Sequence, residues 1–414
     1  MNSGFTRVKA GVVFKEESGK LYRFSARSID VMVAWPNPAA WRKTEQQPSW
    51  TRVRPNIKIP PAIESEIKRY TVPDEEKGQR VLSFWYTDHY PRFAELRWYS
   101  TIPPEVRALL TPFQCRQWHL LSFIARGGQG AAELVALNPA LAFALASNWV
   151  FHTPAVQRPL RAARVLVKKR QRDALSWLGF PGTEAARKVL AKIIPGAVGI
   201  SSLLYLRDAM EDQAVFKALS HLPRLNAGVL RMVTDPELFP YSTPALLEDI
   251  ALCKEENVRT ESAYLLRDSK CMHEQLYPNA ARFPVMRRQV ELHGFHNRLV
   301  DEMSRAEIDT QVKFPPPPLK GTDAIIPITT ARELVEEGRL QHHCVGSYIT
   351  QVAWYKKIYV YRIVHPERAT LAVIRRRGAW RIHELRLACN ETPSLETYHA
   401  VMGWLECQSR DLAI

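Results

Sequence analysis

The spacing of hydrophobic and polar positions divides the chain into stretches with different expected structures. Residues 5–35 alternate with a period of two, and GVVFKEESGKLYRFSA predicts two strands joined by a turn at Ser18–Gly19. From Pro36 to Val81, prolines, tryptophans and charges follow one another without a period, which is typical of an extended surface segment. From Pro104 to Ala306, short apolar runs recur at helical spacing and predict a compact array of helices.

The C-terminal stretch begins with a run of prolines, FPPPPLKGT (residues 314–322), which predicts a stiff extended segment and a domain boundary. Thr330 then precedes Glu333 at the spacing of a helix capping box, and Gly338 lies near the expected end of that helix. The stretches KIYVYRIV, ATLAVIRR and AWRIHELRL predict strands, and Ser394 is the expected cap of a last helix.

The pattern as a whole predicts an α+β protein in three domains. They are a small β element with an extended Pro/Trp-rich segment over residues 1–103, a mainly helical array over 104–313, and a C-terminal domain over 314–414. The last domain is expected to contain helices, an antiparallel three-stranded meander and a final helix.

Composition adds a strong positive charge to this picture. Lys and Arg total 57 against 42 for Asp and Glu, so the formal net charge is +15. Such a charge favours a polyanionic partner, such as nucleic acid, or an acidic protein surface. Hydrophobic residues make up 46% of the chain, which supports sizeable cores and disfavours a mainly disordered protein.

The cysteines and the apolar stretches favour a cytoplasmic protein. The six cysteines form no CxxC pair, and the first residues, MNSGFTRVKAG, lack the apolar core of a signal peptide. The most apolar stretch, AAELVALNPALAFALASNWVF, contains Glu133, Asn138, Pro139 and Asn148, which are costly in a bilayer but acceptable in a buried helix pair. We therefore expect free thiols in a reducing compartment and no membrane span.

The C-terminal arrangement resembles the PcfJ-like family, whose members are found on plasmids and on other mobile or chromosomal loci of bacteria. Four stretches between Phe314 and Trp404 carry the resemblance: FPPPP, ELVEEGRLQHHCVGSY, YVYRIVHPERATLAVI and WRIHELRLACNETPS. The family often has a glycine just before the first strand, where this chain has WYKK (residues 354–357). The resemblance implies an accessory protein of mobile-element biology with no settled activity.

The stretch QHHCVGSY (residues 341–348) offers a candidate nucleophile. If Ser347 caps a helix through YITQVAWY, Cys344 lies just before its N-terminus, where the helix dipole favours a thiolate. The candidate catalytic residues are then His343, Cys344 and Asn390, with His342, His383 and Glu384 as other polar neighbours. We favour the competing interpretation, in which Cys344 is a buried residue in a tight hinge and a histidine bonds to the backbone.

A metal site is a further alternative. Cys271 with His273, His293 with His296, and His342 to Cys344 supply nitrogen and sulfur atoms that suit zinc. None of these groups has the paired ligand spacing of a zinc finger. We therefore predict no metal site, and no cofactor is indicated.

Two basic stretches are candidate nucleic-acid surfaces. On a helix over QRPLRAARVLVKKRQR, one face would carry Arg161, Arg164, Lys168 and Arg172. In the meander, nine cations between residues 356 and 386 outnumber two acids, and the candidates there are Arg375, Arg377 and Arg381. The aromatic residues Tyr359, Tyr361 and Trp380 alternate with these cations, so the sheet would offer stacking as well as charge. The competing interpretations are a solvated helix face and an ordinary core face of the sheet.

Several enzyme classes lack their sequence signatures. The chain has no Walker loop, no GxGxxG after a strand, no GxSxG elbow and no HExxH. Our leading hypothesis is therefore a cytoplasmic accessory protein that binds nucleic acid or a protein partner through basic surfaces, rather than an enzyme. The alternatives are an enzyme that uses Cys344 and a purely structural helical scaffold.

Overall fold

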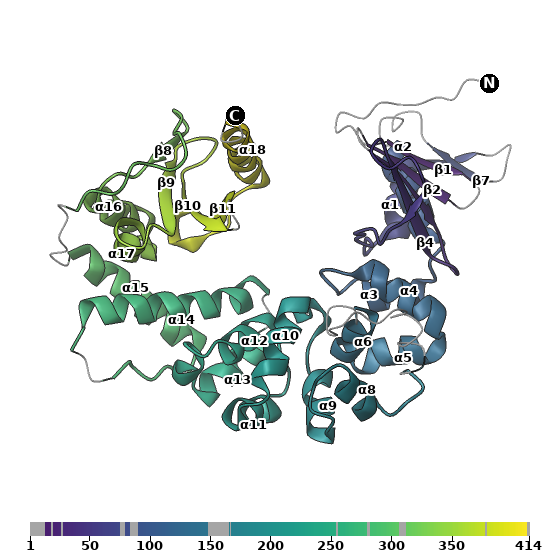
Figure 1. Cartoon of the computed structure of the whole chain (residues 1–414), viewed down its shortest axis with the longest axis horizontal. Helices are drawn as coiled ribbons and strands as arrows, with labels where there is room; N and C mark the ends of the chain where they lie inside the picture. The colour runs from purple at the N-terminus through teal and green to yellow at the C-terminus, as the bar shows by residue number, and fades with distance from the viewer. Residues whose placement is uncertain are drawn as a thin grey trace. The chain divides into compact units, whose positions relative to one another are not determined.

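Figure 1 shows the computed structural model of the chain. The structure describes residues 13–17, 20–25, 28–74, 79–82, 90–147, 165, 167–253, 256–279, 282–305, 312–376 and 379–411. These residues form two compact units, Met1–Pro236 and Glu237–Ile414. Antiparallel sheets combined with many helices confirm the predicted α+β class. Within the described ranges, no helix is long and apolar enough to cross a membrane.

The first unit opens with a five-stranded antiparallel sheet whose strands are neighbours in chain order. They are β1 (Val13–Glu17), β2 (Lys20–Phe24), β3 (Ser28–Val33), β4 (Ala39–Thr44) and β5 (Thr51–Arg52). Asp30 on β3 is 3% exposed and accepts hydrogen bonds from Arg42 Nε and Nη2 on β4, at 2.6 and 2.9 Å. This bidentate ion pair satisfies a buried charge and favours one pairing of the two strands.

The segment from Pro36 to Val81 has more regular structure than its sequence pattern predicts. After β4 and β5 it forms α1 (Ile63–Tyr70), β6 (Thr71–Asp74) and β7 (Gln79–Leu82). Its extended part buries Ile57 and Ile59, and the Ile59 N–H donates to Gln117 Oε1 at 2.6 Å. Single apolar residues between prolines therefore anchor this segment, and such anchors produce no period in the sequence.

Helices complete the first unit and confirm the predicted helical array. They are α2 (Tyr90–Ser100), α3 (Pro104–Leu110), α4 (Gln117–Gly127), α5 (Gln129–Leu137), α6 (Pro139–Ala146), α8 (Gln171–Trp177), α9 (Glu184–Ala191), η3 (Pro195–Ala197), α10 (Ile200–Ala209), α11 (Gln213–His221) and α12 (Ala227–Thr234). Every residue of α6 is buried, and Asn138 caps this helix by accepting from the Leu141 N–H at 3.2 Å. The most apolar stretch of the chain therefore contains a buried helix, as its interrupted composition predicts.

The second unit contains a four-stranded antiparallel sheet in the order β11–β10–β9–β8. The strands are β8 (Ile325–Pro327), β9 (Ile358–Ile363), β10 (Ala369–Arg376) and β11 (Ala379–Arg386). The last three confirm the predicted meander. The additional strand β8 follows the proline run and pairs with β9, where Ile325 lies opposite Ile363.

The helices of the second unit precede, interrupt and follow this sheet. They are η4 (Phe239–Tyr241), α13 (Pro244–Leu252), α14 (Glu256–Leu276), α15 (Gln289–Arg305), α16 (Ala331–Gln341), η5 (Cys344–Tyr348), α17 (Ile349–Ala353), η6 (Ala388–Asn390) and α18 (Leu395–Asp411). Helices α14 and α15 pack on each other, and both contact η5. Elements before and after the proline run therefore pack against each other within this unit.

The proline run itself packs against the sheet. The Tyr359 hydroxyl donates to the Pro315 carbonyl at 3.2 Å, and the Tyr361 hydroxyl donates to the Leu319 carbonyl at 2.9 Å. Phe314 and Leu319 are buried in the same hydrophobic core as the strands. These two tyrosines satisfy backbone carbonyls of a segment that forms few backbone hydrogen bonds of its own.

Helix α16 has the ends that its sequence predicts. Thr330 Oγ1 accepts from the Glu333 N–H at 3.2 Å, and Glu333 Oε2 accepts from the Thr330 N–H at 3.3 Å, which confirms the capping box. At the other end, His342 adopts the left-handed conformation with φ of 50°, and its N–H donates to the Gly338 carbonyl. The chain therefore reverses direction at the first of the two adjacent histidines.

The segment after this reversal differs from the helix expected to start at Ser347. Residues 344–348 form the 3-10 helix η5, all of whose residues are buried, and α17 begins only at Ile349. A Cβ on Gly338 would lie 3.0 Å from the His343 carbonyl oxygen and 3.1 Å from the Gly346 nitrogen. The backbone of η5 therefore crosses α16 at a distance that glycine allows, and this close crossing replaces an exposed helix start.

We expect Gly338→Ala to destabilise the protein by about 1–3 kcal/mol, because the added methyl must displace backbone atoms. This cost opposes the roughly 1 kcal/mol by which alanine is the better helix former. Chemical unfolding followed by circular dichroism measures the difference. Gly403→Ala on α18 is the matched control, since a Cβ there meets no atom within 4 Å. Equal stability of the two variants would show that the crossing imposes no steric constraint.

Candidate functional site

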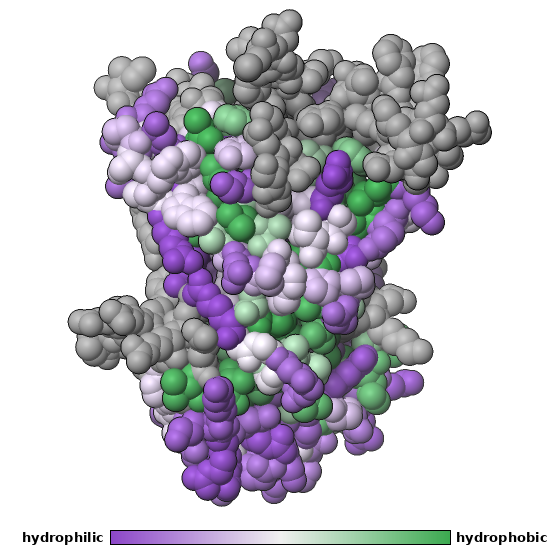
Figure 2. All heavy atoms as spheres, turned by 90° about the vertical axis from the view of Figure 1, so that its right-hand side faces the viewer, coloured by the Kyte–Doolittle hydropathy of each residue, from purple (hydrophilic) through white to green (hydrophobic). Residues whose placement is uncertain are grey.

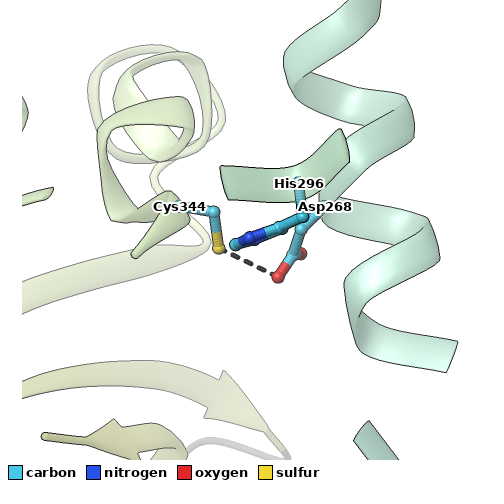
Figure 3. Close-up of side chains that lie close together, drawn as sticks. All are labelled: Asp268, His296 and Cys344. Carbon is cyan, nitrogen blue, oxygen red and sulfur yellow. Dashed lines mark hydrogen bonds between the residues drawn. The ribbon is translucent and has the colours of Figure 1, made fainter. Parts of the chain in front are cut away.

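Three chemically reactive side chains meet in the second unit, as Figure 3 shows: Asp268 from α14, His296 from α15 and Cys344 from the start of η5. One potential ligand atom from each residue lies within 4.8 Å of the others. The Cys344 thiol donates a hydrogen bond to Asp268 Oδ2 at 2.9 Å. Cys344 is 5% exposed and His296 is 1% exposed. We call these three residues the buried cluster.

Two members of the buried cluster interrupt apolar helix faces. Asp268 lies three residues after Leu265 and four residues before Met272, and both of these neighbours are buried. His296 lies four residues after the buried Leu292. Residues three or four positions apart share one face of a helix, so both polar side chains belong to faces that pack inward.

His296 has one ring nitrogen without a partner. Its Nδ1 lies 3.4 Å from Asn297 Oδ1, whereas Nε2 is buried and has no hydrogen-bond partner among the described residues. An amide oxygen only accepts, so this contact assigns the ring proton to Nδ1 and leaves the Nε2 lone pair unused. Burial lowers the pKa of His296 to about 4, so the imidazole is neutral at neutral pH.

The pKa values of the other two members are raised. Burial, together with the negative charge of Glu384, raises the pKa of Asp268 to about 7. Burial and the charge of Asp268 raise the pKa of the Cys344 thiol well above its ordinary value. A nucleophilic cysteine needs a lowered pKa and donates its proton to a base such as histidine. Here the thiol is neutral and donates to Asp268, so the arrangement does not favour nucleophilic catalysis.

His343, the predicted base, has a different partner. Its Nε2 lies 2.9 Å from Thr370 Oγ1, and the Thr370 hydroxyl donates to Glu337 Oε1 at 2.6 Å. A hydroxyl has one proton to give, so His343 Nε2 is the donor to Thr370. Burial lowers the pKa of His343, which keeps it neutral. His343 therefore belongs to a structural network, and no hydrogen bond joins it to the Cys344 thiol.

Glu337 on α16 is the centre of this network and is 0% exposed. Its Oε2 accepts from Arg362 Nε at 2.9 Å and from Arg368 Nη2 at 2.6 Å. Burial alone would raise the pKa of Glu337, but hydrogen bonds from Arg368, Thr370 and Arg362 outweigh it and hold that pKa below its ordinary value. Two cations of the basic meander are therefore neutralised by one buried carboxylate.

Asn390, the third predicted catalytic residue, lines a cavity rather than the thiol. It ends η6 with φ of 62° and borders a cavity of about 430 Å³. Asp268, His296 and His342 line the same cavity. Asn390 therefore faces a space shared with two members of the buried cluster, and His342, unlike its neighbour His343, also opens onto it.

A second cavity, of about 530 Å³, lies beside the cluster. Its walls include Cys271 and Tyr348, and the Tyr348 hydroxyl donates to Glu384 Oε2 at 3.1 Å. Asp268 and Glu384 line both cavities. These two carboxyl groups therefore form a wall that the cavities share.

The basic stripe predicted on one helix is only partly visible. Arg161 and Arg164 lie outside the described residues. Lys168 is exposed in a turn and Arg172 is exposed on α8, so these two do not lie on one helix. Figure 2 shows hydrophilic residues gathered on the lower part of the face drawn there. Lys168 and Arg172 are therefore compatible with an ordinary solvated surface.

The meander divides into a buried aromatic part and an exposed cationic part. Tyr359 and Tyr361 are 2% and 0% exposed, and Trp380 packs partly against the same core. These strand aromatics are therefore core residues rather than stacking surfaces. Arg375 and Arg381 are exposed. Arg377, the third predicted cation of this group, lies outside the described residues.

Sequence reasoning missed Asp268 and Glu337 as site residues. Each acid lies three positions after a buried leucine, Asp268 after Leu265 and Glu337 after Leu334. Both acids therefore lie on an otherwise apolar helix face, and this was the signal available in the sequence. An acid in such a stripe requires a buried partner.

Comparisons with known proteins bear on this unit. Residues 267–402 match the family model for PcfJ-like protein, and all three residues of the buried cluster lie in that range. A shorter stretch is 31% identical over 103 residues to a mitochondrial homoaconitase of Yarrowia lipolytica, covering 22% of this chain and 14% of that protein. No solved structure matches the chain. The resemblance seen in the sequence is therefore confirmed for the C-terminal domain.

We expect Cys344 to resist alkylation in the native protein, because its thiol is buried and its pKa is raised. Iodoacetamide labelling followed by peptide mass spectrometry measures this. The exposed Cys407 is the internal control and should react readily. Protection of Cys344 should disappear on unfolding. Labelling of native Cys344 as fast as Cys407 would instead indicate an accessible, reactive thiol.

We expect Glu337→Gln to cost about 2–4 kcal/mol of stability, since it removes the charged acceptor of two partly buried arginines and of the buried Thr370. The pKa of Glu337 is lower in the folded chain, so its contribution is fully present above its ordinary pKa of 4.5. The stability gap between the wild type and the variant should therefore narrow as the pH falls below about 4.5.

Chemical unfolding at several pH values checks this expectation. The neighbouring Glu336→Gln is the control, because Glu336 is 55% exposed and its ion pair with Arg339 is long, at 3.9 Å. The Glu337 carboxylate would not be the source of this stability if the difference between the wild type and Glu337→Gln did not change with pH. An equal loss of stability in Glu337→Gln and Glu336→Gln would rule it out as well.

Proposed function

We propose that this protein, whose residues 267–402 match the family model for PcfJ-like protein, binds single-stranded nucleic acid as an accessory protein of plasmid or other mobile-element biology. The proposed binding surface is one end of the sheet in the second unit. We call it the sheet-end surface, and its residues are Trp354, Tyr355, Lys356, Lys357, Arg375 and Arg381.

Strand pairing places these residues at one end of the sheet. Strand β9 starts directly after Lys357, whose carbonyl accepts from the Arg375 N–H at 3.4 Å. Arg381 on β11 pairs with Ile374 on β10, next to Arg375. The cations from three chain segments therefore lie at the same end of the sheet, where β9 and β11 begin and β10 ends.

The single observation that carries the proposal is the exposure of two aromatic rings among these cations. Trp354 is 72% exposed and Tyr355 is 65% exposed, whereas rings of this size are usually largely buried. Lys357 Nζ lies 5.8 Å from the centre of the Tyr355 ring. Aromatic faces beside cations suit single strands, because bases stack on the rings and phosphates meet the charges.

The charges of this surface are also available. Lys356, Lys357, Arg375 and Arg381 are exposed, and none of them forms an ion pair with a residue in the described ranges. Other cations of the meander differ, since Arg362 and Arg368 bind Glu337. Unpaired exposed cations can exchange counterions for phosphates, which is the main source of affinity for nucleic acid.

We expect Trp354→Ala in the full chain to weaken binding of a single-stranded oligonucleotide by roughly 5- to 150-fold, from the loss of about 1–3 kcal/mol of stacking. The double substitution Lys356→Gln/Lys357→Gln should make the plot of log association constant against log salt concentration less steep, by about 1.4 in slope. Fluorescence anisotropy over a range of salt concentrations measures both effects.

Matched control variants distinguish the effect of the sheet-end surface from the effect of the protein's overall positive charge. Arg282→Gln/Arg287→Gln removes two exposed cations elsewhere in the second unit, and Tyr205→Ala removes a ring that is 62% exposed in the first unit. Both should bind nearly as the wild type does. The proposal is lost if the folded wild type binds neither DNA nor RNA single strands at low salt, or if the controls lose as much affinity.

A further inference from the structure

One polar atom of the buried cluster has no hydrogen-bond partner. Asp268 and Cys344 share a hydrogen bond, in which the buried thiol donates to the Asp268 carboxyl group at 2.9 Å. Next to them, His296 presents a neutral ring whose Nε2 has no partner and is enclosed by protein. A buried polar atom without a partner costs roughly 1–3 kcal/mol, so the arrangement calls for a further group at this position.

We propose that Asp268, His296 and Cys344 bind one divalent transition-metal ion of the zinc class. The cluster offers a carboxylate oxygen, an imidazole nitrogen and a thiolate sulfur, which together suit zinc and similar metals rather than magnesium or calcium. The ligand atoms lie within 4.8 Å of one another. Ligands around tetrahedral zinc are separated by roughly 3.3–3.8 Å, so side-chain adjustments of about an ångström complete the geometry.

Charge balance supports the same assignment. Binding breaks the Cys344 S–H bond and releases that proton, together with any proton held by the Asp268 carboxyl group, to solvent; the thiolate sulfur and a carboxylate oxygen then each form a bond to the metal. One thiolate and one carboxylate neutralise a divalent ion, while His296 remains neutral. The bound ion and its ligands therefore form a neutral unit, and His296 Nε2 acquires the partner that it lacks.

The site has three protein ligands and access to a cavity. Asp268 and His296 line the cavity of about 430 Å³, whose walls also carry His293 and Asn390. Structural zinc sites have four protein ligands, whereas sites that bind water or a substrate keep one position open. A fourth position facing this cavity would accept water or a small ligand. His296 Nδ1 is already held by Asn297, as the outer nitrogen of a metal-bound histidine usually is.

The test uses the full-length protein after treatment with a chelator, titrated with Co²⁺ under reducing conditions. We expect one equivalent to bind, with the near-ultraviolet charge-transfer band of a thiolate bound to cobalt, and Zn²⁺ should abolish this band by displacement. Cys344→Ser should remove the band. Cys271→Ser and His293→Asn are matched controls on the same two helices, and both should keep it. Absence of the band in the wild type, its persistence in Cys344→Ser or its loss in Cys271→Ser would overturn the proposal.

Two further variants decide the matter if Cys344→Ser does not fold. Asp268→Asn and His296→Gln preserve most of the side-chain volume, and circular dichroism checks their folding. Each should weaken Co²⁺ binding by about 100-fold or more, since even the loss of an outer partner of a ligand costs about 10–100-fold. Wild-type affinity in both folded variants would exclude these residues as ligands.

Discussion

The second unit depends on one buried carboxylate. Glu337 accepts hydrogen bonds from Arg362 on β9, from Arg368 before β10 and from Thr370 on β10, and through Thr370 it reaches His343. A single charge therefore connects α16, two strands and the residue directly before Cys344. Because the charge is fully buried, its partners cannot move away without leaving it unsatisfied, and this cost fixes the start of η5.

The same network explains why the two histidines of QHHCVGSY behave differently. His342 is left-handed and ends α16, whereas His343 is extended and lies against Thr370. The reversal turns one imidazole toward a cavity and the other toward the sheet. His342 therefore ends a helix while His343 joins that helix to the sheet. Together these two histidines determine where the next residue, Cys344, lies.

Much of the fold was predictable from the sequence, because the relevant signals are local. The strands β9 and β10 are short apolar runs, β11 alternates within eight residues, and the α16 capping box lies within four positions. The buried cluster was not predictable in this way, because Asp268 and Cys344 are 76 positions apart. Asp268 and His296 come from helices before the proline run, whereas Cys344 follows it, so the cluster spans the position where the sequence suggested a boundary. Burial also reversed the expected chemistry of Cys344, and burial depends on long-range packing.

The shared wall of the two cavities has a thermodynamic consequence. Asp268 lines both, so its state of protonation or ligation is common to them. A molecule in one cavity that favours the ionised carboxyl changes the affinity of the other cavity for its own ligand. Linkage requires the reverse effect to have the same free energy. The two cavities are thus coupled through side chains that line both of them, Asp268 and Glu384 among these.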